Sequence, residues 1–484
     1  MRLHVIFRYT GYILVLNALA MLLCAAVSLL YAERAFAILL YSGFVAALFG
    51  VFPLIFVPPT ENITNNEGLI ILVASWLVSC LLGALPYVLW GAEFTFTNAW
   101  FESVSGFTTT GSSILTDIEA VPKGILFWRA MTHWIGGMGI IIFALSILPF
   151  IGESARVLYQ SEMSPLAMDN FQIRAKQAVR ILAIVYLGLT VSETILLMIF
   201  GMNFFDALTH AFATVSTGGF SPKNASVAHY HSLPIEMVVM VFMILSGIHF
   251  GVLFSAVAGN FRSLFNSPFV RYYLISMGIG ILLSAAGLYG SQYDNFPEAL
   301  RYAAFQIASV GTSTGFATAD SAVWPALSQV LLIFFTLQCA CAGSTSGGIK
   351  VDRIVLLGKA FRRQMKQLQH PRGVIPITLA GRSIGKEVVE SAILYIAIYL
   401  AVVFIATLLL IAVGTEALEA FSGTAATMGN VGPGLGKVGS LGNFSHISTA
   451  GKWIFSVVML LGRLEIYALI MFFIPRHWKM YSTF

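Results

Sequence analysis

The chain has 484 residues, of which 58% are hydrophobic and 10% are charged, and its mean hydropathy is +0.84. Soluble globular domains carry about 25% charged residues, so this composition excludes a soluble domain and indicates a multi-pass membrane protein. The net charge of +5 does not indicate nucleic-acid binding, because the basic residues cluster between the apolar runs. The four cysteines lie within apolar runs and are expected to be packing residues, not disulfides or metal ligands.

Apolar runs of two lengths alternate along the chain. Runs of about 20 apolar residues can span a membrane, whereas runs of about 10–14 suggest re-entrant segments. The sequence predicts ten full spans, at 9–31, 37–57, 69–91, 124–150, 178–201, 234–258, 270–290, 324–341, 389–413 and 451–474. It predicts four short re-entrant helices, at 96–107, 203–215, 296–310 and 416–428. The first two spans do not repeat this pattern and are expected to form an added N-terminal hairpin.

Each short helix runs directly into a loop of small polar residues and glycine. The loops are Thr108-Thr109-Thr110-Gly111-Ser112, Val215-Ser216-Thr217-Gly218-Gly219-Phe220, Thr312-Ser313-Thr314-Gly315-Phe316 and Gly429-Asn430-Val431-Gly432-Pro433-Gly434. We align them on Gly111, Gly218, Gly315 and Gly432. Four copies of span, short helix, loop and span predict an all-α polytopic fold with four repeats around a pseudo-fourfold pore. The predicted units are the hairpin at 1–60 and pore repeats at 61–155, 156–262, 263–388 and 389–484.

The distribution of lysine and arginine predicts the orientation in the membrane. Basic residues accumulate in cytoplasmic connections, and here they lie between the repeats and in the tail, with nine between residues 349 and 388. Both termini and the connections between repeats are therefore expected to be cytoplasmic, and the short helices to enter from outside. The link at 58–68 is also expected inside, although it contains no lysine or arginine.

The repeated loops have the composition of a cation site made of backbone carbonyls. Irregular backbone at membrane depth is tolerated where it is buried in protein or lines a watery cavity. Glycine allows carbonyls to turn towards an axis, and carbonyl rings can replace a cation's hydration shell. The predicted cation-binding residues are Thr109, Thr110, Gly111, Ser216, Thr217, Gly218, Ser313, Thr314, Gly315, Asn430, Val431 and Gly432. The alternative is that these Ser/Thr/Gly motifs only pack helices together.

Further motifs give the chain a family resemblance. Together with the four loops, the segments His133-Trp134-Ile135-Gly136-Gly137-Met138-Gly139, Gly343-Ser344-Thr345-Ser346-Gly347-Gly348-Ile349-Lys350 and Leu461-Gly462-Arg463-Leu464-Glu465 resemble Trk-type potassium uptake proteins. The resemblance covers nearly the whole chain and includes the N-terminal addition of the TrkH branch of the Trk/Ktr/HKT superfamily. In that superfamily, glycine at all four filter positions goes with potassium, so the resemblance implies transport of K+, with Rb+ as a surrogate. The fourth loop departs from the pattern with Asn430 and Val431 before Gly432.

The eighth predicted span ends in a segment of poor helix formers. Small polar residues and glycines at 342–348 should break the helix before a basic helix begins near Ile349. The resemblance implies that this break is an intramembrane gating loop formed by Gly343, Ser344, Thr345, Ser346, Gly347 and Gly348. The alternative is an ordinary loop at the membrane edge.

Ionisable residues within the predicted spans are few. Arg463 lies about midway along the last span, where such a residue faces the interior or a cavity. A positive charge there would repel a cation by about 4 kcal/mol at about 4 Å with an effective dielectric constant of about 20. The resemblance assigns Arg463 this barrier role; the alternative is a salt bridge to Glu465. Glu102 and Arg129 are predicted to pair behind the first loop. His133, Trp134 and His249 are expected to be packing residues, and Glu193 to lie near the outer interface without an assigned role.

The predicted function is channel-like K+ uptake, without enzymatic activity or an organic cofactor. The alternative is a proton- or sodium-coupled K+ symporter, although the repeats run in parallel and the pore-facing segments offer no clear intramembrane carboxylate. A membrane enzyme would need a nucleophile with its base or a metal site, and the sequence offers neither. The resemblance also implies a homodimer in a bacterial inner membrane, regulated by cytosolic nucleotide-binding subunits of the KTN/RCK type. The basic segment 349–388 is expected to bind these subunits and anionic lipid.

Overall fold

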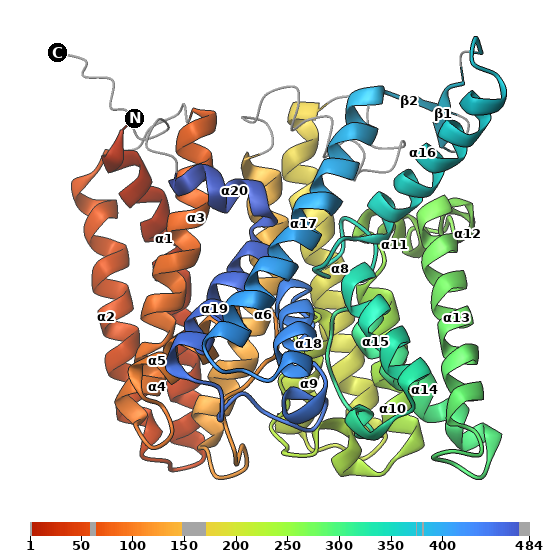
Figure 1. The fold of residues 1–484 in the computed structure, drawn as a ribbon. Helices are drawn as coiled ribbons and strands as arrows, with labels where there is room; N and C mark the ends of the chain where they lie inside the picture. The colour runs from red at the N-terminus through yellow and green to blue at the C-terminus, as the bar shows by residue number, and fades with distance from the viewer. Residues whose placement is uncertain (1, 59–63, 148–170, 374, 380–381, 474–484) are drawn as a thin grey trace.

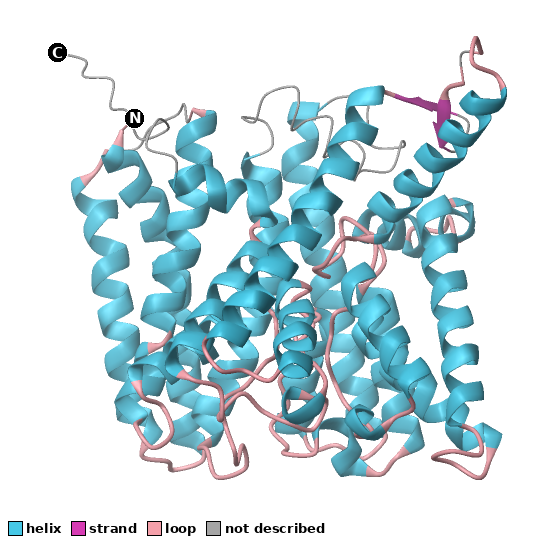
Figure 2. Ribbon diagram, viewed as in Figure 1, coloured by secondary structure: helices cyan, strands magenta, loops and turns pink. Residues whose placement is uncertain are grey.

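Long apolar helices that run between two ends of the molecule make up this computed structural model (Figures 1 and 2). It describes residues 2–58, 64–147, 171–373, 375–379 and 382–473. The helices α1 (Leu3–Leu30) and α2 (Ala35–Phe56) form the predicted N-terminal hairpin, and α1 packs on α3 and α6 of the first repeat. The turn of the hairpin is attached to α6, because the Glu33 carboxylate accepts hydrogen bonds from the backbone N–H groups of Lys123 and Gly124 (2.8 and 3.0 Å).

Four repeats of outer helix, short helix and inner helix follow the hairpin. The first is α3 (Asn65–Gly83) with α4 (Leu85–Trp90), α5 (Phe96–Phe107) and α6 (Lys123–Ile147); the second is α8 (Phe171–Ile199), α9 (Phe204–Val215) and α10 (Leu233–Ser246) with α11 (Phe250–Val257). The third is α13 (Pro268–Leu288), α14 (Phe296–Gly311) and α15 (Ala326–Gln338), preceded by α12 (Arg262–Asn266). The fourth is α17 (Lys386–Ala412), α18 (Ala417–Met428) and α19 (Thr449–Arg463) with α20 (Glu465–Phe473).

The repeats close into a ring. The inner helix of each repeat packs against the short helix of the next: α6 on α9, α10 on α14, α15 on α18, and α19 back on α5. The last of these contacts joins the fourth repeat to the first, so the order around the ring is the order in the chain. The predicted pseudo-fourfold architecture is therefore confirmed.

Two of the predicted inner spans are not continuous helices. All ten predicted positions contain a helix, but only six helices are long and apolar enough to count as membrane spans among the described residues. Two bent pairs bring the total to eight: α10 with α11, bent by 110°, and α19 with α20, bent by 116°. The continuous spans predicted at 234–258 and 451–474 are thus wrong. At the first break, His249 caps the new helix by accepting from the N–H of Gly251 (3.0 Å), which replaces a lost helical bond.

The basic segment after the third repeat forms α16 (Val351–Gln369), in agreement with the helix predicted to start near Ile349. A short antiparallel hairpin, β1 (Ile377–Leu379) and β2 (Arg382–Ile384), was not predicted. In Figure 1, this hairpin, the start of α1 and α20 lie at one end of the molecule, and the short helices α5, α9, α14 and α18 lie in the other half. This arrangement agrees with the predicted topology, whose orientation in the membrane stays a prediction.

Candidate functional site

The four loops after the short helices share one hydrogen-bond pattern. In each loop, a backbone N–H donates to the carbonyl five residues earlier in its own helix. These bonds run from Thr110 to Ser105 (2.9 Å), from Gly218 to Ala213 (2.7 Å), from Thr314 to Ser309 (2.9 Å) and from Val431 to Ala426 (2.8 Å). The shared pattern shows that the loops are structurally equivalent, including the fourth, whose sequence departs from the others.

Backbone conformation fixes the register between the loops. Left-handed φ values of 51–58° occur at Thr109, Thr217, Ser313 and Asn430. Two residues later, φ values of 79–98° occur at Gly111, Gly219, Gly315 and Gly432. The equivalent of Gly111 in the second loop is therefore Gly219, and the sequence alignment on Gly218 is wrong by one residue. The register was ambiguous in the sequence because the second loop has two adjacent glycines. The pair Gly219-Phe220, which matches Gly315-Phe316 of the third loop, could have resolved it.

The four loops meet around a common axis. A Cβ atom on any of the four left-handed glycines would overlap a carbonyl oxygen of the next loop. The pairs are Gly111 with Gly218, Gly219 with Thr314, Gly315 with Val431, and Gly432 with Thr110. This series passes through all four loops and returns to the first. The closed ring thus brings together the carbonyls of four equivalent residues, Thr110, Gly218, Thr314 and Val431, at positions where only glycine allows such a close approach.

Polar side chains brace the ring from behind. The hydroxyls of Thr108 and Thr110 lie 2.7 Å apart, and those of Thr312 and Thr314 lie 2.8 Å apart. Asn430 donates to the hydroxyl of Thr110 (3.0 Å) and so joins the fourth loop to the first. The twelve predicted cation-binding residues all lie in these loops, and ten of them are buried; Gly111 and Gly315 are partly exposed. No charged side chain belongs to the four loops.

The segment 342–348 lies inside the protein, in contact with the loops. Its residues are buried except for Gly343, which is partly exposed, and its side chains bond to two different repeats. Thr345 donates to the carbonyl of Val215 beside the second loop (3.0 Å), and Ser313 of the third loop donates to Ser346 (2.9 Å). The segment is therefore not an exposed surface loop, and its depth in the membrane stays a prediction.

The break in α10–α11 lies against the same segment. The N–H of Phe250 donates to the carbonyl of Gly343 (3.1 Å), and the N–H of Cys341 donates to the carbonyl of Gly247 (3.1 Å). The ring of His249 leaves no room for a Cβ at Gly343. His249 is thus a packing residue, as predicted, but it packs against the segment 342–348, which the sequence did not reveal.

Arg463 connects this segment to the first repeat. Its guanidinium donates to the carbonyl of Thr345 (2.6 Å) and to that of Gly136 (3.0 Å), and the residue is only 4% exposed. Glu465 pairs instead with Arg353 (3.2 Å) and Lys350 (3.5 Å) at the start of α16. A salt bridge between Arg463 and Glu465 is therefore not formed.

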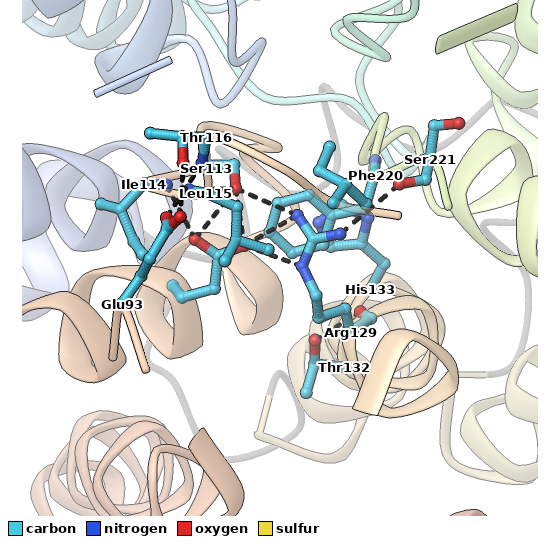
Figure 3. A network of polar contacts seen from close by, with 12 residues as sticks. Glu93, Ser113, Ile114, Leu115, Thr116, Arg129, Thr132, His133, Phe220 and Ser221 are labelled. Atoms are coloured by element: carbon cyan, nitrogen blue, oxygen red, sulfur yellow. Dashed lines mark hydrogen bonds and ion pairs between the residues drawn. The ribbon is translucent and has the colours of Figure 1, made fainter. Parts of the chain in front are cut away.

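Glu102 and Arg129 form the predicted buried ion pair. The two side chains are 0% and 2% exposed, and Arg129 bonds Glu102 at 2.7 Å through one terminal nitrogen. Glu102 also accepts from the hydroxyl of Ser113 (2.9 Å) and the N–H of Ile114 (3.0 Å), just after the first loop. Figure 3 shows Arg129 between Ser113 on one side and Phe220 and Ser221 on the other.

The same network reaches the second loop. Arg129 lies over the ring of Phe220, 4.0 Å from its centroid, and the ring of His133 stacks on Phe220 at 4.1 Å. The N–H of Phe220 donates to Nδ1 of His133 (3.4 Å). The network therefore fixes the first two loops relative to one another from behind, and His133 packs as predicted.

The outer rim of these two repeats is held by polar contacts. Asn224 donates to the carboxylate of Asp117 (2.9 Å), and it accepts from the N–H of Ile118 (2.7 Å). The hydrogen bond from Asn224 lowers the pKa of Asp117 from its usual value. These contacts join the connections that follow the first and second loops.

Comparisons with known proteins agree with this architecture. Residues 41–480 match the family model of TrkH, described as a cation transport protein. The chain is 35% identical to the Trk system potassium uptake protein TrkH of Salmonella typhimurium, over 99% of this chain and 100% of that protein. It is 32% identical to the Escherichia coli protein TrkG over 86% of each chain. The crystal structure of the potassium transporter TrkH from Vibrio parahaemolyticus superposes with a TM-score of 0.90 at 34% identity, covering 99% of this chain and 100% of that one.

These relatives are named for transport and not for catalysis, as expected for a chain without a predicted enzyme site. The match extends from the N-terminal hairpin to the last repeat and includes the arrangement in space. The chain belongs to the TrkH family of cation transport proteins.

Proposed function

We propose that this protein carries K+ across the membrane through a pore whose filter is the ring of carbonyls of the four loops. The observation that supports it is the closed series of glycine–carbonyl contacts from Gly111 to Gly432. Four carbonyl dipoles around an axis suit a monovalent cation, since they replace its hydration shell without a carboxylate. Two relatives are named as potassium uptake proteins, which supports K+ as the transported ion.

In this proposal, the segment 342–348 is the gate and Arg463 is a barrier on the same path. The hydrogen bond between Ser313 and Ser346 supports a position directly beside the filter. The Arg463 guanidinium adds a fixed positive charge and ties the segment to Gly136. Opening would require the segment to move and these bonds to break.

The proton- or sodium-coupled symporter remains the second candidate because of one observation. Glu193 is a fully buried carboxyl within an outer helix, the kind of group that coupled transporters use for a coupling ion. It lies behind a short helix, however, and not on the ring of carbonyls.

Partners and location are proposals as well. The exposed basic face of α16 supports contact with a cytosolic KTN/RCK-type subunit or anionic lipid. The family supports a homodimer in a bacterial inner membrane with both termini in the cytoplasm.

The test is Rb+ flux into liposomes that hold the purified protein, with the voltage set and with K+ or Na+ as competitors. We expect saturable flux that K+ blocks and Na+ does not, and that follows the voltage without a pH gradient. Flux that requires a proton or sodium gradient would favour the symporter and contradict the pore. Equal block by Na+ would contradict the carbonyl filter.

A further inference from the structure

Glu193 lies on α8 with its side chain fully buried, at 0% exposure. Within the described part of the chain, neither carboxyl oxygen has a hydrogen-bond partner. Burying an ionised carboxylate without a partner is among the largest costs a folded protein can carry. The position therefore demands either a cation or a bound proton.

The neighbouring helix offers no hydrogen to a carboxylate at this position. α8 packs against α9, whose last turn carries Thr214. The hydroxyl of Thr214 already donates its single hydrogen to the carbonyl of His210 (2.8 Å). It therefore has no hydrogen left to stabilise an ionised Glu193. The partial negative charge at the end of α9 also disfavours a carboxylate there.

The charged groups on the helices that pack against α8 already interact with residues other than Glu193. On α6, Arg129 pairs with Glu102, and the ammonium group of Lys123 lies over the ring of Tyr31, 3.9 Å from its centroid. On α9, Asp206 accepts from Tyr230 (2.9 Å), and His210 contacts Ser221 (3.0 Å) and the carbonyl of Asp206 (2.7 Å).

The remaining two neighbours offer no cation either. On α10, Glu236 pairs with Arg301 (2.7 Å), and the sequence of α11 contains no charged residue. On α8 itself, Arg180 lies about 20 Å away along the helix. None of the described cations neutralises Glu193.

We propose that Glu193 is a proton-binding site of the second repeat, whose bound proton keeps the buried carboxyl uncharged beside α9, the helix packed against α8. This inference rests on the proposed function, because α9 leads into the second loop of the filter. The carbonyl of Val215, the last residue of α9, accepts from Thr345 of the segment 342–348 (3.0 Å). Loss of the proton places an unpaired negative charge behind both the filter and this contact, so it lowers flux.

The direct test is the infrared spectrum of the purified protein in lipid at neutral pH. A protonated buried carboxyl gives a carbonyl-stretch band separate from those of carboxylates and amides. We expect this band in the wild type, its loss in Glu193→Gln, and its persistence in the control Thr194→Val. Thr194 lies beside Glu193 on α8 and donates only to the carbonyl of Thr190 (2.8 Å). A spectrum in which Glu193→Gln removes no such band would overturn the proposal.

The second test is the pH dependence of Rb+ flux with the same pH on both sides. Wild-type flux should fall at alkaline pH, by about tenfold per pH unit once the site is mostly ionised. Glu193→Gln, which has nearly the same shape and cannot ionise, should retain neutral-pH flux and lose the alkaline decline. An unchanged pH profile, or loss of all flux in a folded Glu193→Gln protein, would overturn the role in conduction.

The two tests separate this inference from the proposed function. If Glu193→Gln abolished a requirement for a proton gradient, the proton would be transported and not resident, and the symporter would replace the pore. If the wild type carried no Rb+ at any pH, the proposed function would fail, and the infrared band would still decide whether Glu193 holds a proton.

Discussion

Four residues with side chains, Thr109, Thr217, Ser313 and Asn430, adopt the left-handed backbone conformation at equivalent points of the ring. Such a conformation costs on the order of 1–3 kcal/mol for a residue with a Cβ. At Ser313 the cost is offset by bonds to the segment 342–348, since its hydroxyl accepts from the N–H of Gly347 (3.1 Å) and donates to Ser346. Strain in the loops is therefore maintained by the surrounding protein, and substitutions here should alter ion selection before they alter folding.

Gly219→Ser tests the register of the second loop. The new Cβ would overlap the carbonyl of Thr314 and push it off the ring. We expect the preference for K+ over Na+, measured by competition against Rb+ flux, to fall about tenfold, which corresponds to about 1.4 kcal/mol.

Gly290→Ser is the matched control for this substitution. Gly290 also has a positive φ (74°), but a Cβ there would meet no atom within 4 Å. It should keep the ion preference of the wild type. Equal effects of the two substitutions would mean that backbone strain, and not the contact with Thr314, changes selection.

Arg463→Ala should raise flux. It removes the positive charge and both bonds to carbonyls, and each charge-assisted hydrogen bond contributes about 1.5–3 kcal/mol. We expect Rb+ flux per protein to rise by about tenfold or more. Arg463→Lys keeps the charge but does not reach both carbonyls, so low flux in the lysine variant identifies charge as the barrier. Unchanged flux in a folded Arg463→Ala protein would contradict both roles.

At the scale of elements, the inner helices differ in where they break. The third ends at Gln338 before the segment 342–348, the second bends at 247–249, and the fourth bends at Leu464. Two of these breaks touch the segment itself, through His249 and Arg463. The segment is therefore held by breaks in neighbouring helices as well as by the loops, and not by regular helix packing.

The pair of Glu102 and Arg129 links α5 to α6 and should contribute strongly to stability. Glu102→Gln leaves a guanidinium buried without its anion, and breaking a buried pair in this way costs about 3–5 kcal/mol. We expect a clear fall in the Tm of the protein in detergent. The control is Glu390→Gln in the exposed pair with Lys386, where the loss should stay near 0.3–0.5 kcal/mol (about the value for i,i+4 pairs). If the Tm of Glu102→Gln fell no further than that of the control, a stabilising role for the network would be ruled out.

The lengths of the apolar runs predicted which helices form, but not where the inner helices break. The ten apolar runs and four short stretches all contain helices, because run length is a local property of the sequence. The breaks near His249 and Leu464 were missed. At the first of them, the N–H of Phe250 bonds to the carbonyl of Gly343, which lies far away in the chain and is not a local property of the sequence. The pairing of Glu102 with Arg129 could be predicted because membrane depth leaves a buried charge few choices.

At the scale of the whole molecule, the junction between the fourth and first repeats decides whether the ring is closed. Asn430 donates to the hydroxyl of Thr110 (3.0 Å) and to the carbonyl of Met459 (3.0 Å). Ser112 donates across the same junction to the carbonyl of Gly432 (3.0 Å). This closure connects residues more than three hundred positions apart, and no local pattern predicts it.

Asn430→Ala should weaken this closure. The loss of two buried hydrogen bonds is expected to lower stability by about 1–3 kcal/mol and to reduce the K+ preference, because the fourth carbonyl is no longer held against the first loop. Tm and competition flux together measure the two effects. Asn443→Ala, which removes only a cap on Ser445 in the outer loop, serves as the control. A variant at 430 that kept both Tm and ion preference would show that the ring closes without this side chain.

The four loops occupy equivalent positions, yet each has its own sequence within one polypeptide chain. Threonine, glycine, threonine and valine supply the four carbonyls. In a channel made of four identical subunits, every substitution occurs in all four subunits and changes all four parts of the filter. Here a substitution changes one quarter and leaves three intact. Mutations in one loop can therefore change ion selectivity in small steps. One loop, such as the fourth with its valine, can acquire a different role while the other three still form the ring.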